Sequence, residues 1–461
     1  MRIALPYIYR KRTGQGCNPP LALLYLATSL QKNNFEVKVF DLDGFSGGLQ
    51  EMIAKIMDFN PDVVGIPIFT ASLKDARIAC QELRKRSTKI NIIAGGPHPS
   101  ACPEDTLILF PEVDFLLRGE SDYTICKLIE NLQNNTARPE IAGLSYRNGG
   151  SIVSHPVGVA PHNLDDIPIP DRKLLWDNYQ KGVYWCIGNK GTTDLMITSR
   201  GCPFSCNFCF KLESGYRFRS PENIVKELVY LLSLGIKTIH FEDDLFTVNK
   251  SRCINICRMI VDAGLKLHLK VRSRVDTIDE EMLVEMRKCG VKAVVYGFES
   301  GSQKILDNMN KKTKVDRNYD VIRMTKKVGL QCYADMFIGF PGETPETIAE
   351  TERFLLKARP TAINIGILSP FPATQVYLEA KKNGTLIGDW VVYGQWPYIK
   401  LPWMKDLSTL RKHLKRIKRR FYLNPLVTFN ILRLNVFNMN LKQWKGAFLY
   451  LYSNLFLRKR G

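Results

Sequence analysis

The strongest constraint on the fold of this chain is a repeated alternation of short, β-rich apolar runs with longer amphipathic stretches. Near the N-terminus the runs that predict strands are Arg2–Leu5, Val37–Asp41, Val63–Pro67, Ile90–Ala94 and Phe115–Leu117. The stretches with helical apolar spacing between them are Leu21–Gln31, Leu49–Asp58, Leu73–Arg86 and Tyr123–Leu132. This α/β alternation favours a parallel sheet covered by helices on both faces. We expect a five-stranded, doubly wound, Rossmann-like sheet over residues 1–135, with its ligands beyond the carboxyl ends of the strands.

The same rhythm returns later in the chain. Residues 136–190 contain chain breakers such as Gly149-Gly150 and are expected to form a linker. Six further βα units follow, with strands expected at Asp194–Thr198, Thr238–Glu242, Leu267–Val271, Ala293–Phe298, Cys332–Ile338 and Ala362–Leu368. They predict a partial (β/α)6 TIM-type barrel over residues 191–400, with its chemistry at the carboxyl ends of the strands.

Positive charge is concentrated at the C-terminal end. The 461-residue chain has a formal net charge of +20, yet from Lys405 onward it has fourteen Lys or Arg and one acid, Asp406. We expect residues 401–461 to form a basic, aromatic-rich helical extension. It could bind nucleic-acid phosphates, contact an anionic membrane surface through aromatics such as Phe437 and Trp444, or cap the barrel. The aromatics favour a membrane over a nucleic acid.

Twelve cysteines and a start without a secretory signal favour the cytoplasm and reduced thiols. No apolar run is long enough to span a membrane. Cys202, Cys206 and Cys209 follow the first predicted barrel strand, and three thiolates on one loop can share a metal centre. A closed zinc site needs a fourth ligand, whereas an iron–sulfur cubane held by three cysteines leaves one iron open. A zinc knuckle and plain buried cysteines remain alternatives. Cys253 and Cys257 lack further soft ligands nearby, which favours core packing.

The loop from Cys202 to Cys209 resembles the signature loop of the radical S-adenosylmethionine (SAM) enzymes. Later loops at predicted strand ends fit the same family: Phe241–Asp244, Arg272–Asp276, Gly297–Gln303, Ile338–Thr344 and Pro370–Thr374, the last with Ala373 where glycine is usual. The resemblance implies a 4Fe-4S cluster on the three cysteines, with SAM bound at the open iron. It implies these SAM contacts: Phe208, the acids Glu242, Asp243 and Asp244, and Arg274 or Glu299 with Ser300. Helix caps and surface ion pairs are the alternatives for the individual charged residues.

The N-terminal module lacks the G-x-G-x-x-G fingerprint, because Gly14–Pro20 places two prolines where the helix should start. A dinucleotide site is therefore disfavoured. Its strand-end loops instead resemble the cobalamin-binding module that precedes the barrel in one radical SAM branch. The resemblance implies these cobalamin contacts: Thr70, Ser72, Gly95, Gly96 and Glu120. No D-x-H-x-x-G string occurs, so we expect cobalt without a histidine ligand and His98 as a hydrogen-bonding wall residue. A module that binds nothing is the alternative.

The resemblance implies a cobalamin-dependent radical SAM enzyme. The expected reaction methylates an unactivated carbon or phosphorus of a small-molecule or lipid-like substrate, through a 5′-deoxyadenosyl radical and methylcobalamin. An external one-electron reductant of the flavodoxin or ferredoxin type is implied, and the tail is a candidate for peripheral membrane contact. One alternative is a non-methylating oxidative cyclase or ring-rearranging enzyme. Another is a nucleic-acid-binding or RNA-modifying protein that uses the basic tail.

Overall fold

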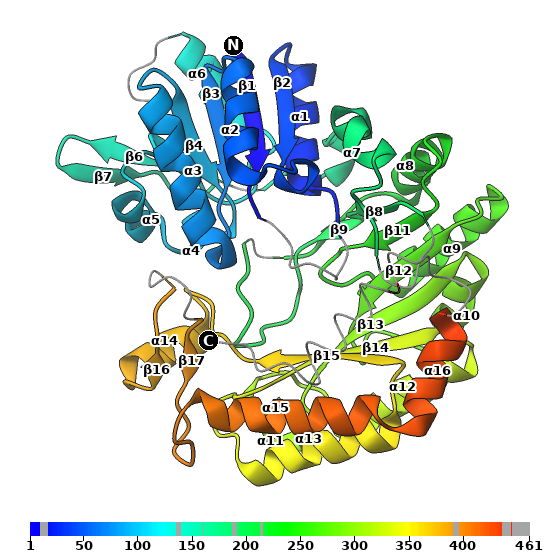
Figure 1. The fold of residues 1–461 in the computed structure, drawn as a ribbon. Helices are drawn as coiled ribbons and strands as arrows, with labels where there is room; N and C mark the ends of the chain where they lie inside the picture. Colours follow the sequence, from blue (N-terminus) through cyan, green and yellow to red (C-terminus); the bar gives the residue numbers. More distant parts are fainter. Residues whose placement is uncertain are drawn as a thin grey trace.

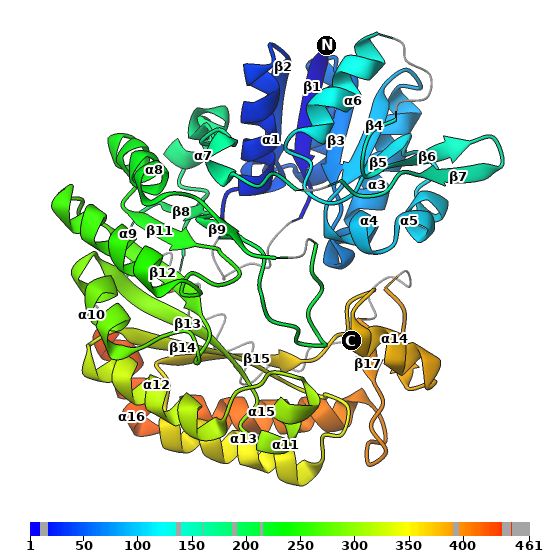
Figure 2. The ribbon, with the colours of Figure 1, turned by 180° about the vertical axis from the view of Figure 1, so that it is seen from behind.

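The computed structural model describes residues 1–9, 17–134, 140–158, 160–186, 191–212, 215–390, 396–435 and 444. Two sheets dominate it, a seven-stranded sheet in the N-terminal half and a six-stranded sheet in the C-terminal half (Figure 1). We call the parts built on them the first and the second lobe. Seen from behind in Figure 2, the two lobes again lie one above the other, with the chain between β9 and β10 passing through the middle.

The first lobe is a mostly parallel sheet in the order β2-β1-β3-β4-β5-β6-β7. Its strands are β1 Arg2–Tyr7, β2 Glu36–Asp41, β3 Val63–Pro67, β4 Asn91–Gly95, β5 Phe115–Leu117, β6 Leu144–Asn148 and β7 Ser151–Ser154. Its helices are α1 Leu21–Lys32, α2 Gly48–Asp58, α3 Leu73–Arg86, α4 Pro97–Ala101, α5 Pro103–Leu109 and α6 Thr124–Gln133. Short 3-10 turns, η1 Leu42–Gly44 and η2 Thr70–Ser72, follow β2 and β3.

Strand alternation divides the apolar side chains of this sheet between two cores. In β1, Ile3 and Leu5 belong to the core that includes residues of α1 and α6. Ala4 belongs to the opposite core, which includes residues of α2, α3 and α5. Successive side chains of a strand point to opposite faces, so a continuous apolar run requires helices on both sides. The doubly wound arrangement predicted from the sequence is confirmed.

The first sheet differs from the prediction in its number of strands. Residues 144–154, expected within the linker, form the antiparallel hairpin β6–β7, and β6 pairs with β5. The turn is Gly149-Gly150, and Gly149 has φ +63°. Two glycines between short alternating runs are a hairpin signal as well as a chain-breaker signal, because a tight hairpin turn needs positive φ. The rest of the connecting segment contains η3 Leu164–Asp166, η4 Arg172–Leu175 and α7 Trp176–Gln180.

The second lobe is an open six-stranded parallel sheet in the order β15-β14-β13-β12-β11-β8, as the partial barrel prediction requires. Its strands are β8 Thr193–Met196, β11 Thr238–Phe241, β12 His268–Ser273, β13 Val291–Glu299, β14 Gln331–Ile338 and β15 Ala362–Ile367. The intervening helices are α8 Pro221–Ser233, α9 Lys250–Asp262, α10 Glu280–Lys288, α11 Gln303–Asn308, α12 Val315–Lys327 and α13 Pro345–Ala358. Cys253 and Cys257 of α9 are fully buried in this core, which confirms the packing interpretation, although the fold also brings the buried Cys289 next to Cys257.

The chain after β15 forms α14 Gln375–Lys382, the two-stranded pair β16 Leu386–Ile387 and β17 Tyr398–Ile399, α15 Leu407–Tyr422 and α16 Pro425–Asn435. The basic helix α15 packs on the barrel: Leu410, Ile417 and Phe421 are buried, and Tyr422 Oη donates to the Ile363 carbonyl at 2.8 Å. The described part of the tail therefore caps the barrel. Phe437, Phe448, Tyr450, Tyr452 and Phe456 lie outside the described residues. Within the described residues, no helix is both long and apolar enough to cross a membrane.

Candidate active site

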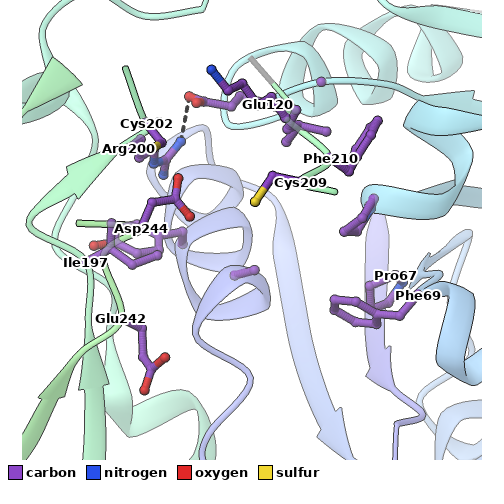
Figure 3. Close-up of a pocket in the computed structure, with 18 of the residues that line it drawn as sticks. Pro67, Phe69, Glu120, Ile197, Arg200, Cys202, Cys209, Phe210, Glu242 and Asp244 are labelled. Carbon is purple, nitrogen blue, oxygen red and sulfur yellow. Dashed lines mark hydrogen bonds and ion pairs between the residues drawn. The ribbon is translucent and has the colours of Figure 1, made fainter. Parts of the chain in front are cut away.

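A cavity of about 800 Å³ lies between the two lobes. Its wall in the first lobe includes Pro67, Gly95 and Leu117, which end β3, β4 and β5. Its wall in the second lobe includes Ile197, Glu242 and the three cysteines of the predicted metal loop. Figure 3 shows Cys202, Cys209 and Asp244 across the cavity from Pro67 and Phe69. The carboxyl ends of both sheets therefore face one space, which is where ligands of such folds bind.

The cysteine loop is closed at its base by two short antiparallel strands, β9 Ser199–Arg200 and β10 Arg217–Phe218. Gly201 follows β9 with φ +85°, and a Cβ atom there would collide with the carbonyl oxygen of Gly215. The close approach of two backbone segments thus requires glycine at this position. The residues between β9 and β10 form one loop, and this loop contains all three cysteines.

The far part of this loop is held by contacts from remote segments. The Asn207 amide donates to the Met309 carbonyl at 3.2 Å, and the Asn207 carbonyl accepts from the Val376 amide at 3.1 Å. Asn310 Nδ2 donates to the Ser205 carbonyl at 2.8 Å. Because these anchors flank Cys206, the middle cysteine is positioned by the segment at the end of α11 and by the start of α14, as well as by its own loop.

The three thiols lie on one wall of the cavity. Burial raises the pKa of Cys209 to about 12, and Cys206 and Cys202 both add to that increase by charge repulsion. Arg274, which is buried, directs Nη1 toward Cys206 Sγ at 3.5 Å and places its guanidinium 3.7 Å from the ring centre of Phe204. Among the described residues, no three His, Cys, Asp or Glu side chains converge closely enough to hold a single metal ion.

Charged side chains from β11 to β14 line the cavity in pairs. Arg272 Nε donates to Glu242 at 3.1 Å and Nη1 donates to Asp335 at 3.3 Å. Glu299 forms an ion pair with Lys311 at 2.8 Å. The register between β13 and β14 shifts at Gly297 and Glu299, and Glu299 has φ +63°. A bulge of this kind redirects a side chain, and left-handed backbone at a residue other than glycine occurs preferentially at functional sites.

A second set of charges connects the two lobes. Glu120 and Asp122 follow β5 in the first lobe, whereas Arg200 and Arg217 come from β9 and β10 at the base of the cysteine loop. Arg200 Nη1 lies 2.8 Å from Glu120 Oε2 and 2.7 Å from Asp122 Oδ2, and Arg217 also pairs with Glu120. Figure 3 shows the Arg200–Glu120 contact as a dashed line. We call these four residues the interlobe ion cluster.

Several predicted site residues do line the cavity, and others do not. Those on its wall are Cys202, Cys206, Cys209, Glu242, Arg274, Glu299, Gly95, Gly96 and Glu120. Asp243 is buried behind the wall, where it accepts from the Thr198 amide at 2.6 Å and from Ser199 Oγ at 2.8 Å. The next residue, Asp244, faces the cavity instead. Asp243 therefore links the end of β11 by hydrogen bonds to the residues just before the cysteine loop.

Four other predicted contacts are not among the described residues that line the cavity. Ser300 is buried beside Thr351 Oγ1 at 3.1 Å. Phe208 packs on Phe337, with ring centres 5.0 Å apart. Ser72 Oγ donates to the Phe69 carbonyl at 3.2 Å.

Thr70 is also buried, and its Oγ1 lies 3.1 Å from His98 Nδ1. Burial lowers the pKa of His98 to about 4, so the ring is neutral at physiological pH. The structure thus places His98 in a hydrogen bond inside the first lobe, as expected, but His98 is not among the described residues that line the cavity. Phe69, next to Thr70, is the side chain of this loop that lines the cavity.

Sequence reasoning missed Arg200, Arg272, Lys311 and Asp335 as cavity residues. Two signals could have found some of them. Arg272 is two residues from Arg274, so both project from the same side at the end of β12. Asp335 occupies the same alternating side of β14 as Phe337. Lys311 and Arg200 have no local signal, because their partners come from other elements.

Comparison with known proteins adds to this geometry. The family model described as "Radical SAM superfamily" matches residues 196–355, and the one described as "B12 binding domain" matches residues 11–129. An uncharacterized methyltransferase of Pyrococcus horikoshii is 34% identical over 427 residues, which cover 90% of each chain.

Two more distant relatives carry names of different reactions. The anaerobic magnesium-protoporphyrin IX monomethyl ester cyclase of Cereibacter sphaeroides is 27% identical, covering 88% of this chain and 68% of the relative. The cytidylyl-2-hydroxyethylphosphonate methyltransferase of Streptomyces wedmorensis is 26% identical, covering 80% and 79%.

Among solved structures, the radical S-adenosylmethionine methyltransferase TsrM from Kitasatospora setae, with cobalamin and a [4Fe-4S] cluster bound, has the same fold. The TM-score is 0.74 at 17% identity, and the alignment covers 92% of this chain and 89% of that chain. The two-lobed arrangement is therefore shared over nearly the whole length of both proteins.

Proposed function

Because the chain belongs to the radical SAM superfamily and carries the B12-binding domain of the cobalamin-dependent branch, we propose that it is a cobalamin-dependent radical SAM methyltransferase. Its substrate is a small molecule, methylated at an unactivated carbon or phosphorus. The observation that carries the proposal is the shared cavity, which sets the three cysteines of the second lobe opposite the strand-end glycines Gly95 and Gly96 of the first. When bound, the cluster supplies the electron that splits SAM, and cobalamin carries the methyl group.

The donor set supports a cluster at Cys202, Cys206 and Cys209. Three thiols on one loop suit an iron–sulfur cubane with one open iron better than a closed zinc site, which needs a fourth ligand. The guanidinium of Arg274 faces Cys206 and would offset part of the negative charge of the thiolates. Arg274 itself is kept in place by Asp276, which accepts from both Nε and Nη2 at 2.9 Å.

The paired charges of the second lobe support a zwitterionic ligand such as SAM. Ammonium and carboxylate groups that leave water need partners of opposite charge. Glu242 and Glu299 offer acceptors on the cavity wall, while Arg272 and Lys311 offer donors. We propose that Asp244 rather than Asp243 joins this set, because Asp244 lines the cavity whereas Asp243 is buried behind its wall.

The first-lobe wall supports cobalamin bound without a histidine ligand to cobalt. It combines apolar side chains, including Tyr25, Leu26 and Phe69, with backbone exposed at Gly95 and Gly96. The described lining residues include no histidine, and His98 is engaged by Thr70. We propose that backbone and apolar groups, instead of a side-chain ligand, hold the corrin here.

A lipid-like substrate and peripheral membrane contact are further proposals. The apolar part of the cavity wall supports the first. The second is supported by α15 and α16, where exposed Arg411, Lys412 and Arg419 precede three exposed apolar side chains: Leu423, Leu426 and Phe429, which are 56%, 56% and 65% exposed. Basic and apolar groups side by side favour an anionic membrane surface.

The test is a product analysis with SAM labelled in its methyl group. The anaerobically purified chain is reconstituted with iron, sulfide and hydroxocobalamin, and reduced with titanium(III) citrate. The proposal predicts two products, 5′-deoxyadenosine from reductive SAM cleavage and S-adenosylhomocysteine from methyl donation, and the methyl label should be recovered on cobalamin or on the methylated substrate. An oxidative cyclase, the alternative favoured by the Cereibacter relative, would form 5′-deoxyadenosine without S-adenosylhomocysteine.

Two variants make the assay specific. Cys206→Ala removes a loop thiol and is expected to abolish 5′-deoxyadenosine and to lower the iron content. Cys102→Ala, at a half-buried cysteine outside the cavity wall, is the matched control and should behave like the wild type. A wild type that forms neither product would refute the proposed function.

A further inference from the structure

The interlobe ion cluster is the feature of the cavity that neither the fold nor the proposed chemistry requires. Resting on the proposed function, we propose that Glu120, Asp122, Arg200 and Arg217 are positioning residues that set the cysteine loop at a defined distance from the cobalamin-binding wall. Glu120, expected from the sequence to contact cobalamin, then acts through the two arginines instead.

Arg200 makes several directional contacts with the two carboxylates of the first lobe. Arg200 donates to both oxygens of Asp122, from Nη1 to Oδ2 at 2.7 Å and from Nη2 to Oδ1 at 3.2 Å. Its Nη1 also donates to Glu120 Oε2 at 2.8 Å. Bidentate guanidinium–carboxylate contacts fix both distance and angle, which a single lysine contact does not.

The second arginine repeats the arrangement from the opposite strand of the loop base. Arg217 Nη1 lies 3.2 Å from Glu120 Oε2 and donates to the Pro161 carbonyl at 2.6 Å. Arg200 and Arg217 are direct partners in the β9–β10 pair. Glu120 therefore receives one guanidinium from each strand that brackets the cysteines.

The four side chains of the interlobe ion cluster are largely buried, so the loss of one contact is costly. The side chains of Glu120, Asp122, Arg217 and Arg200 are 8%, 5%, 13% and 17% exposed. Exposed ion pairs contribute little, but loss of one partner of a buried pair leaves an uncompensated charge. Arg200 also lies 5.5 Å from the ring centre of Tyr25 in α1, which is a further contact with the first lobe.

The position in the chain explains the proposed role. Arg200 is separated from Cys202 only by Gly201, so a shift of Arg200 relative to the first lobe moves the start of the metal loop. Methyl donation requires groups held by both lobes to meet, whereas reductive SAM cleavage requires the second lobe alone. A displacement of about 1 Å can lower the rate of a positioned reaction about 100-fold.

The test uses the full-length reconstituted chain and the double variant Glu120→Gln/Asp122→Asn. We expect iron and cobalamin contents to remain at wild-type levels and 5′-deoxyadenosine formation to persist. S-adenosylhomocysteine formation should fall about 100-fold. The matched control is Asp114→Asn, which breaks an Arg84 contact of 2.7 Å within the first lobe.

A spectroscopic readout separates positioning from general damage. The reduced cluster and cobalt(II) corrin are both paramagnetic, and the cluster speeds the spin relaxation of cobalt in a distance-dependent way. The double variant should lose this enhancement and Asp114→Asn should keep it. In the full-length chain without cofactors, hydrogen exchange should rise at β9 and β10 of the double variant.

If the double variant does not fold, Arg200→Lys provides the second test, because it keeps the charge and loses the bidentate geometry. It should show the same selective loss. Unchanged relaxation and S-adenosylhomocysteine formation in both the double variant and Arg200→Lys would overturn the proposal. Loss of cobalamin would also overturn it, since Glu120 would then be a cofactor contact. A wild type without either product would count against the proposed function alone.

Discussion

Arg172 provides a quantitative test of how the connecting segment holds the second lobe together. Its side chain is 0% exposed, with Nε 3.1 Å from Asp194 Oδ2 and Nη1 2.6 Å from Glu227 Oε1, both of them also 0% exposed. Nη1 and Nη2 each donate to a backbone carbonyl, of Pro170 and Leu195, at 2.8 Å. Arg172 thus connects η4 to β8 and α8 through groups that have no access to water.

The perturbation is Arg172→Met, which keeps an unbranched side chain and removes the charge. Removing one partner of a buried ion pair costs about 3–5 kcal/mol, because the remaining charge stays buried without compensation. Asp194 keeps Tyr179 Oη at 3.0 Å and Glu227 keeps Arg219 at 2.5 Å, so we expect a loss near the lower end, about 3 kcal/mol. This corresponds to a roughly 100-fold increase in local opening.

The assay is hydrogen exchange of the amides of β8 and α8 in the full-length chain. Arg323→Met is the control, because that side chain is 79% exposed and pairs with Asp320 on the same helix. Burial already raises the pKa of Asp194, and loss of Arg172 raises it further. A carboxyl group with a raised pKa in the folded state favours folding as pH falls, so the variant should recover stability toward pH 5. A loss below about 1 kcal/mol, or one independent of pH, would refute this reasoning.

Two further predictions concern pH and the membrane. Burial raises the pKa of Asp41 to about 7 although Tyr184 Oη donates to it at 2.8 Å, and Asp43, Tyr7 and Cys17 lie nearby. The free energy of unfolding should therefore fall as pH rises from about 4 to 7, by up to about 1.4 kcal/mol per pH unit for this group. In the variant Asp41→Asn, the urea concentration at the unfolding midpoint should depend less on pH between pH 5 and 8. Glu343, whose pKa burial also raises to about 7, should keep part of the slope. The full-length chain should sediment with vesicles of phosphatidylserine and phosphatidylcholine and less with phosphatidylcholine alone. Leu426→Asp/Phe429→Asp should weaken this binding while Ile108→Asp, at an exposed site on α5, should not, and equal binding by both variants would contradict the membrane proposal.

Local patterns were sufficient for the positions of the main elements. Val63–Pro67, Leu73–Arg86 and Phe115–Leu117 have the same bounds in the structure as in the prediction. Their periodicity reports which faces are buried, and that information is contained within a few consecutive residues. The hairpin β6–β7 was missed for the same reason, because Gly149-Gly150 signals a turn without showing that its strands join the first sheet.

Some features of the site could likewise be predicted from the sequence, and others could not. The spacing of Cys202, Cys206 and Cys209 could be read directly, because one loop carries the whole donor set. The choice between Asp243 and Asp244 could not, since the backbone after β11 turns one carboxylate behind the wall and the next one into the cavity. The same difference occurs after β3, where Thr70 is buried away from the wall and the neighbouring Phe69 lines the cavity.

The sequence by itself determined the two parallel sheets, their order along the chain and the three-cysteine loop, because strand periodicity and ligand spacing are local properties. Only the tertiary structure decided which strand-end side chains share the cavity and that Glu120 meets Arg200, 80 residues away. Such a contact depends on how the two lobes pack against each other. The physical reason is that burial and charge pairing between lobes are set by shape and distance in space, and these leave no periodic signal along the chain.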